Sequence, residues 1–311
     1  MKLDAHVHTY YSGNTTIKPI DRLLMESYST PEEVYRVAKR RGMDLVTITD
    51  HNSIAGVLTI ADRSDVIVGC EVTAVFPEDG VNCHIGVLGI NETQHPDIQR
   101  LRSNALELAQ YLQERRIFSI LNHVASTSAG RLSASHIFAL LPWIDAVEIR
   151  NGTRLRSQNR TAAALAHAHG KVTAAGSDSH TYRGIGKTYI TCENARNRDE
   201  FLIELRRGRV HAGGRDGCRF TLAADILRLA ARFYADGLEK LIEHPFEWRR
   251  YMMVVGATLA LPLTAVALAG SLIHYILDER FNRALLLDLV AHSIDGRRAA
   301  PPQVRELEPA F

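Results

Sequence analysis

The chain has 311 residues, of which 46% are hydrophobic, so it can bury a full core and is not a disordered protein. A net charge of +2 and a sequence pI of about 8.4 are too mild to indicate a surface dedicated to nucleic acid or acidic lipid, and we expect no stable nucleic-acid binding. The four cysteines form no Cys-x-x-Cys pair, which argues against a zinc knuckle or a disulfide scaffold and favours a reducing cytosol.

The chain starts with a short alternating segment and without the apolar core or cleavage site of a secretory signal, so we expect a cytoplasmic domain. Asp4, His6 and His8 alternate with apolar residues, and in an extended strand they share one face. The two imidazoles then lie about 6 to 7 Å apart, close enough to bind one cation. A His-x-His triplet also arises by chance in a chain with 14 histidines, so the downstream sequence must support this interpretation.

Strand-like and helix-like segments alternate after this start. Thr30, followed by a proline and two glutamates, is the start of a helix that we expect to end near Gly42. Strands are predicted at 45–49, 66–70, 85–90, 118–122, 143–149 and 171–176, and helical segments at 98–116 and 161–168. Such alternation predicts a largely parallel sheet or barrel.

Side chains of the metal-binding type occur where these strands end. Five expected strands are followed by histidines or carboxylates, and another begins with a histidine: His6, His8, Asp50, His51, Glu71, His84, His123, Asp178 and His180. The C-terminal ends of parallel barrel strands meet at one mouth, where active sites are built. Any one of these residues is ordinarily a turn or capping residue. Together, without cations, they would leave buried polar groups poorly satisfied, so the set predicts a multi-metal site.

These motifs resemble the PHP (polymerase and histidinol phosphatase) domain family, in particular its stand-alone phosphoesterases, over about residues 1–213. The resemblance rests on the segments His6-Val7-His8, Thr49-Asp50-His51, Gly69-Cys70-Glu71, His84, His123 and Ser177-Asp178-Ser179-His180. It implies an α/β fold, a distorted (β/α)7 barrel of PHP type, here with a helical C-terminal extension. It also implies two or three divalent metal ions and hydrolysis of a phosphate ester.

The resemblance further implies how the ligands are shared. One metal would be held by His6, His8, Glu71 and Asp178. Glu71 would bridge to a second metal held by His84 and His123, and a third would be held by His51 and His180. Glu71 and Asp178 would be the catalytic residues.

The match departs from the family pattern between residues 12 and 30, where an insertion precedes the helix start. An additional ligand to the third metal is therefore left open. Asn14, Asp21 and Glu26 are candidates, and we interpret the two carboxylates as solvated loop residues.

Imidazole and carboxylate ligands suit Zn, Mn or Fe, and these ligand types do not distinguish among the three metals. Two such cations can activate water and clamp a phosphoryl group, so a small phosphoester or nucleotide could be hydrolysed without a protein nucleophile. Arg150, Arg154 and Arg183 lie near the predicted mouth and suit bidentate phosphate contacts. Asp50, next to His51 in the sequence, could orient a metal ligand without binding the metal itself, or only cap the turn.

Two other functions fit the same residues. One is a non-catalytic PHP-like module that binds metal for a structural or regulatory role, and the other is an amidohydrolase-type hydrolase of C–N bonds. The presence of nearly all ligand positions favours the phosphoesterase. The sequence does not decide among nucleotide, oligonucleotide, sugar-phosphate and histidinol-phosphate substrates, and it does not give the oligomeric state.

The C-terminal region, 214–311, has a different composition. Residues 251–277 contain no Asp, Glu, Lys or Arg and would form a helix about 40 Å long, longer than the roughly 30 Å hydrocarbon core of a bilayer. We predict a membrane span here that anchors the cytoplasmic domain. Pro262 fits the alternative of two short helices buried in a soluble cytoplasmic protein. An amphipathic helix at 222–242 would lie on the membrane or cover the barrel.

Overall fold

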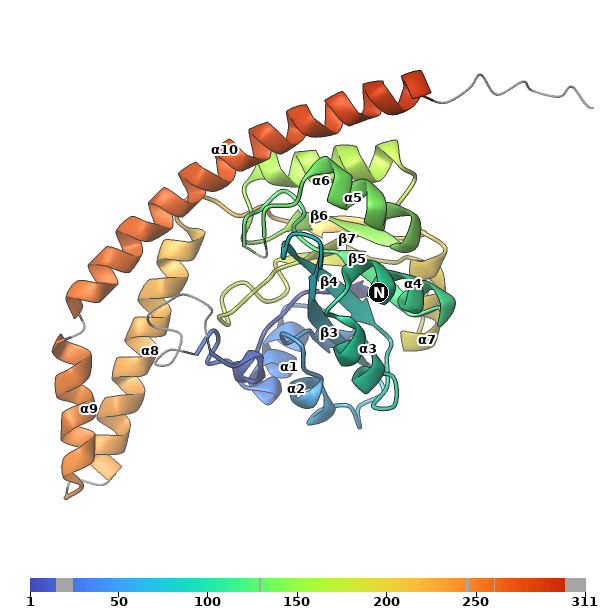
Figure 1. Ribbon diagram of the computed structural model, residues 1–311. Helices are drawn as coiled ribbons and strands as arrows, with labels where there is room; N and C mark the ends of the chain where they lie inside the picture. The colour runs from blue at the N-terminus through green and yellow to red at the C-terminus, as the bar shows by residue number, and fades with distance from the viewer. Residues whose placement is uncertain (15–24, 129, 244–245, 260, 300–311) are drawn as a thin grey trace, which may run out of the picture.

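The structure is a computed structural model that describes residues 1–14, 25–128, 130–243, 246–259 and 261–299. Its centre is a curled sheet with the strand order β2-β3-β4-β5-β6-β7 (Figure 1). These strands are β2 (Val46–Ile48), β3 (Val66–Val75), β4 (Asn82–Leu88), β5 (Phe118–Leu121), β6 (Ala146–Asn151) and β7 (Val172–Gly176). A smaller sheet has the order β1-β8-β9 and consists of β1 (Lys2–Leu3), β8 (Thr188–Thr191) and β9 (His211–Gly214).

The central sheet is parallel except around β4. β2 pairs with β3, and β5, β6 and β7 pair in sequence, all in parallel. β4 is antiparallel to both β3 and β5. This reversal places the start of β4 at the edge of the sheet where its neighbours end, which is why a histidine that begins a strand can join residues that follow strands.

Helices cover the outside of the sheet. They are α1 (Pro31–Arg40), α2 (Ala55–Leu58), α3 (His95–Leu101), α4 (Ala105–Glu114), α5 (Ala134–Leu140), α6 (Arg156–Ala168) and α7 (Arg198–Arg206). The predicted start of α1 is confirmed, because the Thr30 side chain accepts a hydrogen bond from the Glu33 backbone N–H and a proline follows at the first position. The single helix expected at 98–116 is two helices, and Asn104 caps the second by accepting from Leu106 and Glu107.

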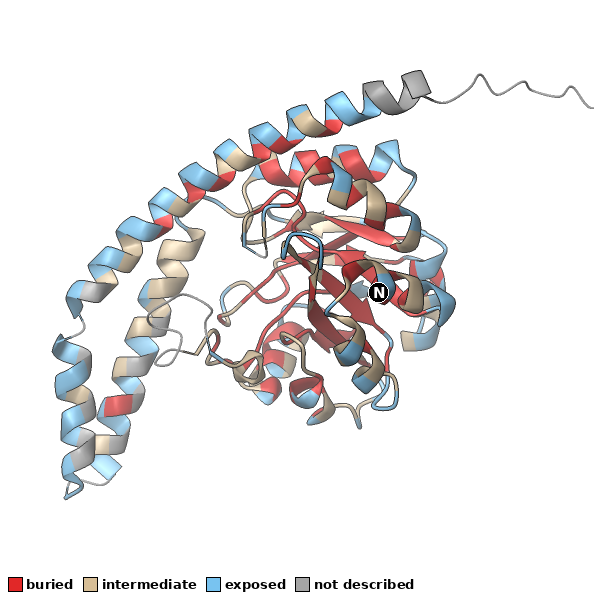
Figure 2. Ribbon diagram, viewed as in Figure 1, coloured by how far each residue is buried: buried red, intermediate tan, exposed pale blue. Residues whose placement is uncertain are grey.

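The apolar side chains of the strands and of the inner helix faces form the core. Phe118, Ile67 and Leu108 are among its largest fully buried members. Figure 2 shows buried residues concentrated in the sheet and in the sides of the helices that face it. The core therefore makes the strand ends a rigid frame for the residues that follow them.

Three long helices complete the described chain: α8 (Thr221–Glu243), α9 (Trp248–Leu259) and α10 (Leu261–Ala299). In Figure 1, α8 and α9 lie side by side and extend away from the sheet, while α10 runs along α6 and α5. The predicted α/β class with a helical C-terminal region is confirmed. The count of seven β/α units and the domain boundary at residue 213 stay predictions.

The predicted membrane span at 251–277 is wrong, and so is the membrane anchor inferred from it. The uncharged run is divided between α9, which has 12 residues and measures about 18 Å, and the first part of α10. That part continues directly into Asp278, which is fully buried against the rest of the protein. Among the helices that the structure describes, none combines the length and the apolar character needed to cross a bilayer.

Candidate metal centre

The carboxylate of Glu71, in β3, lies at the centre of the predicted site and is fully buried. Its Oε1 lies 3.2 Å from His6 Nε2, 3.2 Å from His84 Nδ1 and 3.1 Å from His123 Nε2. Its Oε2 lies 3.2 Å from His51 Nδ1 and 3.5 Å from His8 Nε2. Five imidazoles from well separated parts of the sequence therefore surround one carboxylate. The strand predicted to end before Glu71 in fact continues to Val75.

Asp178 provides a second buried carboxylate on the turn after β7. Its Oδ1 lies 3.6 Å from His6 Nε2 and 3.5 Å from His8 Nε2. Its φ of 50° is in the left-handed region, which is uncommon for a residue with a side chain. Such a conformation persists only where surrounding contacts hold it, and it recurs at functional sites.

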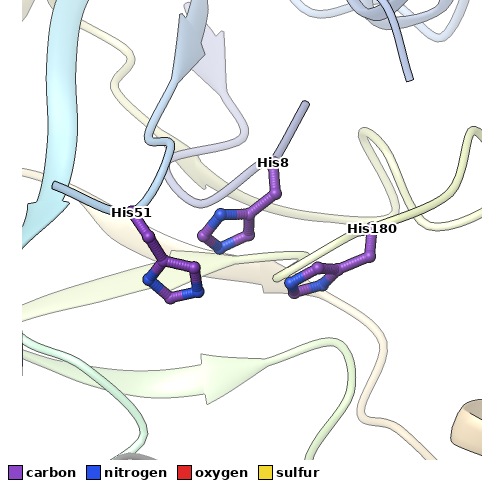
Figure 3. Close-up of side chains that lie close together, drawn as sticks. All are labelled: His8, His51 and His180. Atoms are coloured by element: carbon purple, nitrogen blue, oxygen red, sulfur yellow. The ribbon is translucent and has the colours of Figure 1, made fainter. Parts of the chain in front are cut away.

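A third group lies at one side of these two carboxylates. Figure 3 shows the rings of His8, His51 and His180 close together, and the His8 ring stacks against both others with centroids 4.5 and 4.4 Å away. Glu26 faces the outer pair: its Oε2 lies 3.4 Å from His51 Nε2, and its Oε1 lies 3.5 Å from His180 Nε2. Our interpretation of Glu26 as a solvated loop residue is therefore wrong. Asp21 lies outside the described residues, and Asn14 is exposed.

The described residues contain four sets of three side chains whose donor atoms lie within 4.8 Å of one another in each set: His6, His8 and Glu71; His6, His123 and Asp178; His51, Glu71 and His84; and His8, His51 and His180. The first set lies within the group that the resemblance placed on one metal, and the last set adds His8 to the expected pair of His51 and His180. His84 and His123, expected to share a metal, fall in different sets, although their Nδ1 and Nε2 atoms are 3.4 Å apart. All eight predicted ligands thus belong to one connected cluster, and their roles as ligands remain our proposal.

The donor atoms fit divalent cations because several of them are buried without a hydrogen bond. His6 Nε2, His8 Nε2, His51 Nδ1, His180 Nε2 and Glu71 Oε2 are buried and have no hydrogen-bond partner. Buried polar atoms are nearly always hydrogen-bonded, so five such atoms in one place need an explanation. Cations bound by their lone pairs would satisfy all of them, and mixed nitrogen and oxygen donors suit Zn, Mn or Fe.

The opposite nitrogen of three rings is fixed by an outer partner. His6 Nδ1 lies 2.9 Å from Glu148 Oε1, and His180 Nδ1 lies 3.2 Å from the Asp178 carbonyl oxygen. Both oxygens accept, so each Nδ1 carries a proton, and Nε2 is the nitrogen left to present its lone pair to a cation once the ring is neutral. His8 Nδ1 lies 3.1 Å from Ser12 Oγ. This arrangement is typical of histidines that bind metals.

Asp50 supports this frame through Ser12. Its carboxylate accepts from the backbone N–H of Thr9 (2.6 Å), the Thr9 hydroxyl (2.7 Å) and the Ser12 hydroxyl (2.9 Å). Because the Ser12 hydroxyl donates to Asp50, its oxygen accepts from His8. Asp50 therefore reaches the His8 ring through Ser12, and its role in orienting a ligand stays a prediction.

Sequence reasoning missed Glu148, which connects three parts of the site. Its Oε1 holds His6, and its Oε2 accepts from the His123 backbone N–H and the Asn151 side chain, both at 2.9 Å. Glu148 is buried in β6, where it follows the apolar residues Ala146 and Val147. A carboxylate inside a buried strand indicates that a partner is present, because an unpaired buried charge is costly. This was the one feature of the sequence that could have identified Glu148.

Mutual electrostatics of the cluster explain its pKa shifts. Burial raises the pKa of Glu71, but the His6, His84 and His51 imidazoles outweigh it and hold that pKa well below its usual range. Burial lowers the pKa of His180, but Glu26 outweighs it and raises that pKa to about 9. Burial and the neighbouring His180 and His51 lower the pKa of His8 to about 3. The cluster thus combines anionic carboxylates with neutral and cationic imidazoles.

The three arginines proposed for phosphate lie in different settings. Arg154 Nη2 lies 3.1 Å from Asp178 Oδ2, so its guanidinium borders the cluster. Arg150 donates to the Gly214 carbonyl oxygen (2.7 Å) and lies 3.8 Å from Asp216 Oδ1. Arg183 is exposed. Arg154 is the one of the three that the structure brings to the cluster.

Comparisons with known proteins agree with the predicted family. Residues 156–210 match the family described as PHP-associated, which confirms this prediction. A segment of 86 residues is 35% identical to an uncharacterized protein of Methanocaldococcus jannaschii, covering 28% of this chain and 42% of that protein. The chain therefore matches less than half the length of this relative.

Three solved structures are similar to about two thirds of the chain. PsfC from Pseudomonas syringae has a TM-score of 0.48 at 16% identity, covering 67% of this chain and 94% of its own. A proposed metal-dependent phosphoesterase from Bifidobacterium adolescentis has a TM-score of 0.43 at 17% identity, covering 67% and 96%. An amidohydrolase from Chromobacterium violaceum has a TM-score of 0.45 at 16% identity, covering 68% and 97%. The family match and the donor clusters together indicate a metal-dependent hydrolase.

Proposed function

We propose that this chain, a protein of the PHP family, hydrolyses phosphate esters with two or three divalent metal ions. The observation that carries the proposal is the group of buried, unpartnered donor atoms around Glu71. Divalent ions at these donors would supply Lewis acidity, both to activate water near neutral pH and to neutralise phosphoryl oxygens.

The residues of the chain would divide the remaining work. Glu71 would contribute both of its oxygens to holding the ions, because these oxygens face different imidazoles. Glu148 and Ser12 would keep the His6 and His8 rings turned with Nε2 inward. Arg154 would bind a phosphoryl oxygen beside the cluster, since a guanidinium suits bidentate contacts with phosphate.

A thiol nucleophile is disfavoured at this site. Cys70 is the residue before Glu71, but it is fully buried, and burial together with the Glu71 and Asp50 carboxylates strongly raises the pKa of its thiol. A protonated thiol is a poor nucleophile. Activated water is therefore the attacking group that this site favours.

The test is a substrate panel applied to protein that has been stripped with a chelator and reloaded with Mn, Zn or Fe. The panel contains phosphomonoesters, phosphodiesters, nucleotides, oligonucleotides, sugar phosphates and histidinol phosphate, together with amides and cyclic amides. We expect hydrolysis of at least one phosphate ester that requires the added metal. Cleavage of C–N bonds alone would indicate the amidohydrolase chemistry instead, and bound metal without any hydrolysis would indicate a non-catalytic module.

A further inference from the structure

A buried carboxylate on the C-terminal helix α10 contacts the loops behind the metal centre. Asp278 is fully buried, although it directly follows the uncharged run. Its Oδ1 accepts from the backbone N–H of Thr127 (2.9 Å) and from the Thr127 hydroxyl. Its Oδ2 accepts from the Ser126 hydroxyl (2.9 Å) and from Gln158 Nε2 (3.0 Å). Four donors offset the desolvation cost of the carboxylate, so this contact is specific.

The segment that Asp278 holds begins at His123, one of the proposed ligands. His123 has a φ of 26°, a strained value for a residue with a side chain. Its backbone N–H donates to Glu148, and its carbonyl oxygen accepts from the Ser126 N–H at 2.9 Å. The strained turn is therefore held by Glu148 at one end and by Asp278 at the other. Strained backbone persists only where its surroundings hold it in this way.

The same face of α10 also supports the loop beside Asp178. Tyr275 lies three residues before Asp278, so the two side chains project from neighbouring positions on one helix face. The Tyr275 hydroxyl donates to the Thr153 carbonyl oxygen (3.3 Å), and the Thr153 hydroxyl donates to Asp178 Oδ2 (2.9 Å). One helix face thus reaches the surroundings of two proposed ligands.

We propose that Asp278 is a positioning residue of the metal centre. Through Ser126 and Thr127 it fixes the turn that presents the His123 imidazole, which makes α10 part of the framework of the site. The inference rests on the proposed metal-dependent function. Its test is therefore metal binding itself, which can fail for Asp278 while the wild-type protein still binds.

The principal variant is Asp278→Asn in the full chain. Asparagine has a similar shape, but it loses the charge and turns an N–H2 group toward groups that are themselves donors. We expect Mn2+ or Zn2+ to bind about 10-fold more weakly, the lower end of the loss that is typical when a group bonded directly to a ligand is removed, because Asp278 acts on His123 through Ser126 and Thr127; competition with a chromophoric chelator measures this. We also expect the visible absorption of the Co2+-loaded protein to change, because His123 would be displaced.

Asp288→Asn is the matched control on the same helix. Asp288 Oδ2 accepts from the Ala134 backbone N–H (2.7 Å) at the start of α5, so it docks α10 without touching the turn after His123. The control should bind metal with wild-type affinity and the wild-type Co2+ spectrum, even if its melting temperature falls. Thr127→Val removes one donor to Asp278 and keeps its charge. We expect a several-fold loss of affinity, which serves as a second measure if Asp278→Asn does not fold.

The outcomes separate the two proposals. If Asp278→Asn and Thr127→Val bind metal like Asp288→Asn, with the same Co2+ spectrum, Asp278 only docks the helix and the inference is overturned. If the wild-type protein itself binds no divalent metal, the proposed function fails, and the positioning role with it.

Discussion

Replacing Glu71 with glutamine tests the centre of the site, because this carboxylate faces five imidazoles. Oε1 lies within 3.2 Å of nitrogens of His6, His84 and His123. Glutamine has nearly the same volume, but it removes the negative charge and turns an N–H2 group toward nitrogens that would present lone pairs. Packing in β3 is thereby kept while the donor oxygen and its charge are lost.

The expected magnitude follows from the position of Glu71 in the cluster. Loss of an outer partner of a metal ligand typically costs about 10- to 100-fold in affinity. Glu71 would contact more than one ion directly, so Glu71→Gln should weaken binding by at least about 100-fold, or about 2.8 kcal/mol at about 1.4 kcal/mol per factor of ten. Hydrolysis of a chromogenic phosphate ester should fall below about 1% of the wild-type rate.

Elemental analysis after dialysis at fixed free metal gives the bound ions, and initial rates in the same buffer give the activity. Glu204→Gln is the matched control, since Glu204 is also buried but bonds to Arg207 and Arg209 on the outside of α7. The control should keep wild-type metal content and rate. Wild-type metal content and turnover in Glu71→Gln would refute the role of Glu71 as a bridging ligand.

Three further predictions concern the groups around this carboxylate. Glu148→Gln should weaken metal binding about 10- to 100-fold, because one of the two acceptor oxygens becomes an N–H2 group, so that either the His6 ring or the His123 backbone N–H loses its acceptor; an unchanged affinity in chelator competition would show that Glu148 does not support the site. Glu26→Gln and His51→Ala should each lose one ion and retain the others, since both face the cluster with His180; elemental analysis showing loss of all metal would prove the grouping wrong. Metal binding at pH 7 should release protons, because the pKa of His180 is about 9 in the metal-free protein and its ring must lose a proton to bind, so the apparent affinity should rise up to about pH 9. Calorimetry in buffers of different ionisation enthalpy measures this release, and a value of zero would contradict it.

The position of a ligand along its strand could be predicted from the sequence. The local sequence pattern is enough to place a histidine or carboxylate at the end of a strand. The parallel pairing of β5, β6 and β7 then brings such strand ends together. The bridge between His51 and Glu71 shows how this works, since it continues the pairing of β2 with β3 beyond the end of β2. His84 joins them because β4 is antiparallel.

The supporting carboxylates could not be predicted in the same way. Glu148 is 142 residues from His6 in the sequence, and Asp278 is 151 residues from Thr127. A carboxylate that orients a ligand has the same side chain as a solvated one, so only the fold distinguishes the two. The interpretation of Glu26 as a solvated residue fails for this reason, because nothing in its neighbouring residues indicates that its carboxylate lies against His51 and His180.

The membrane prediction failed on a related point. The absence of charge in 251–277 predicts one long apolar helix. The run is instead shared by α9 and α10, and neither is both long and apolar enough within the described residues. Asp278, at the end of the run, could be interpreted as the polar flank of a span, whereas the structure buries it against Ser126 and Thr127.

Titration of metal back into the chelator-treated full chain tests the central claim most directly. Hydrolysis of a phosphate ester and the number of bound ions are followed together as Mn2+ or Zn2+ is added. The proposed site predicts no hydrolysis before addition, and activity that rises with binding and saturates at two or three ions per chain. Hydrolysis that survives complete removal of metal, or saturated binding with no cleavage of any phosphate ester, would contradict it.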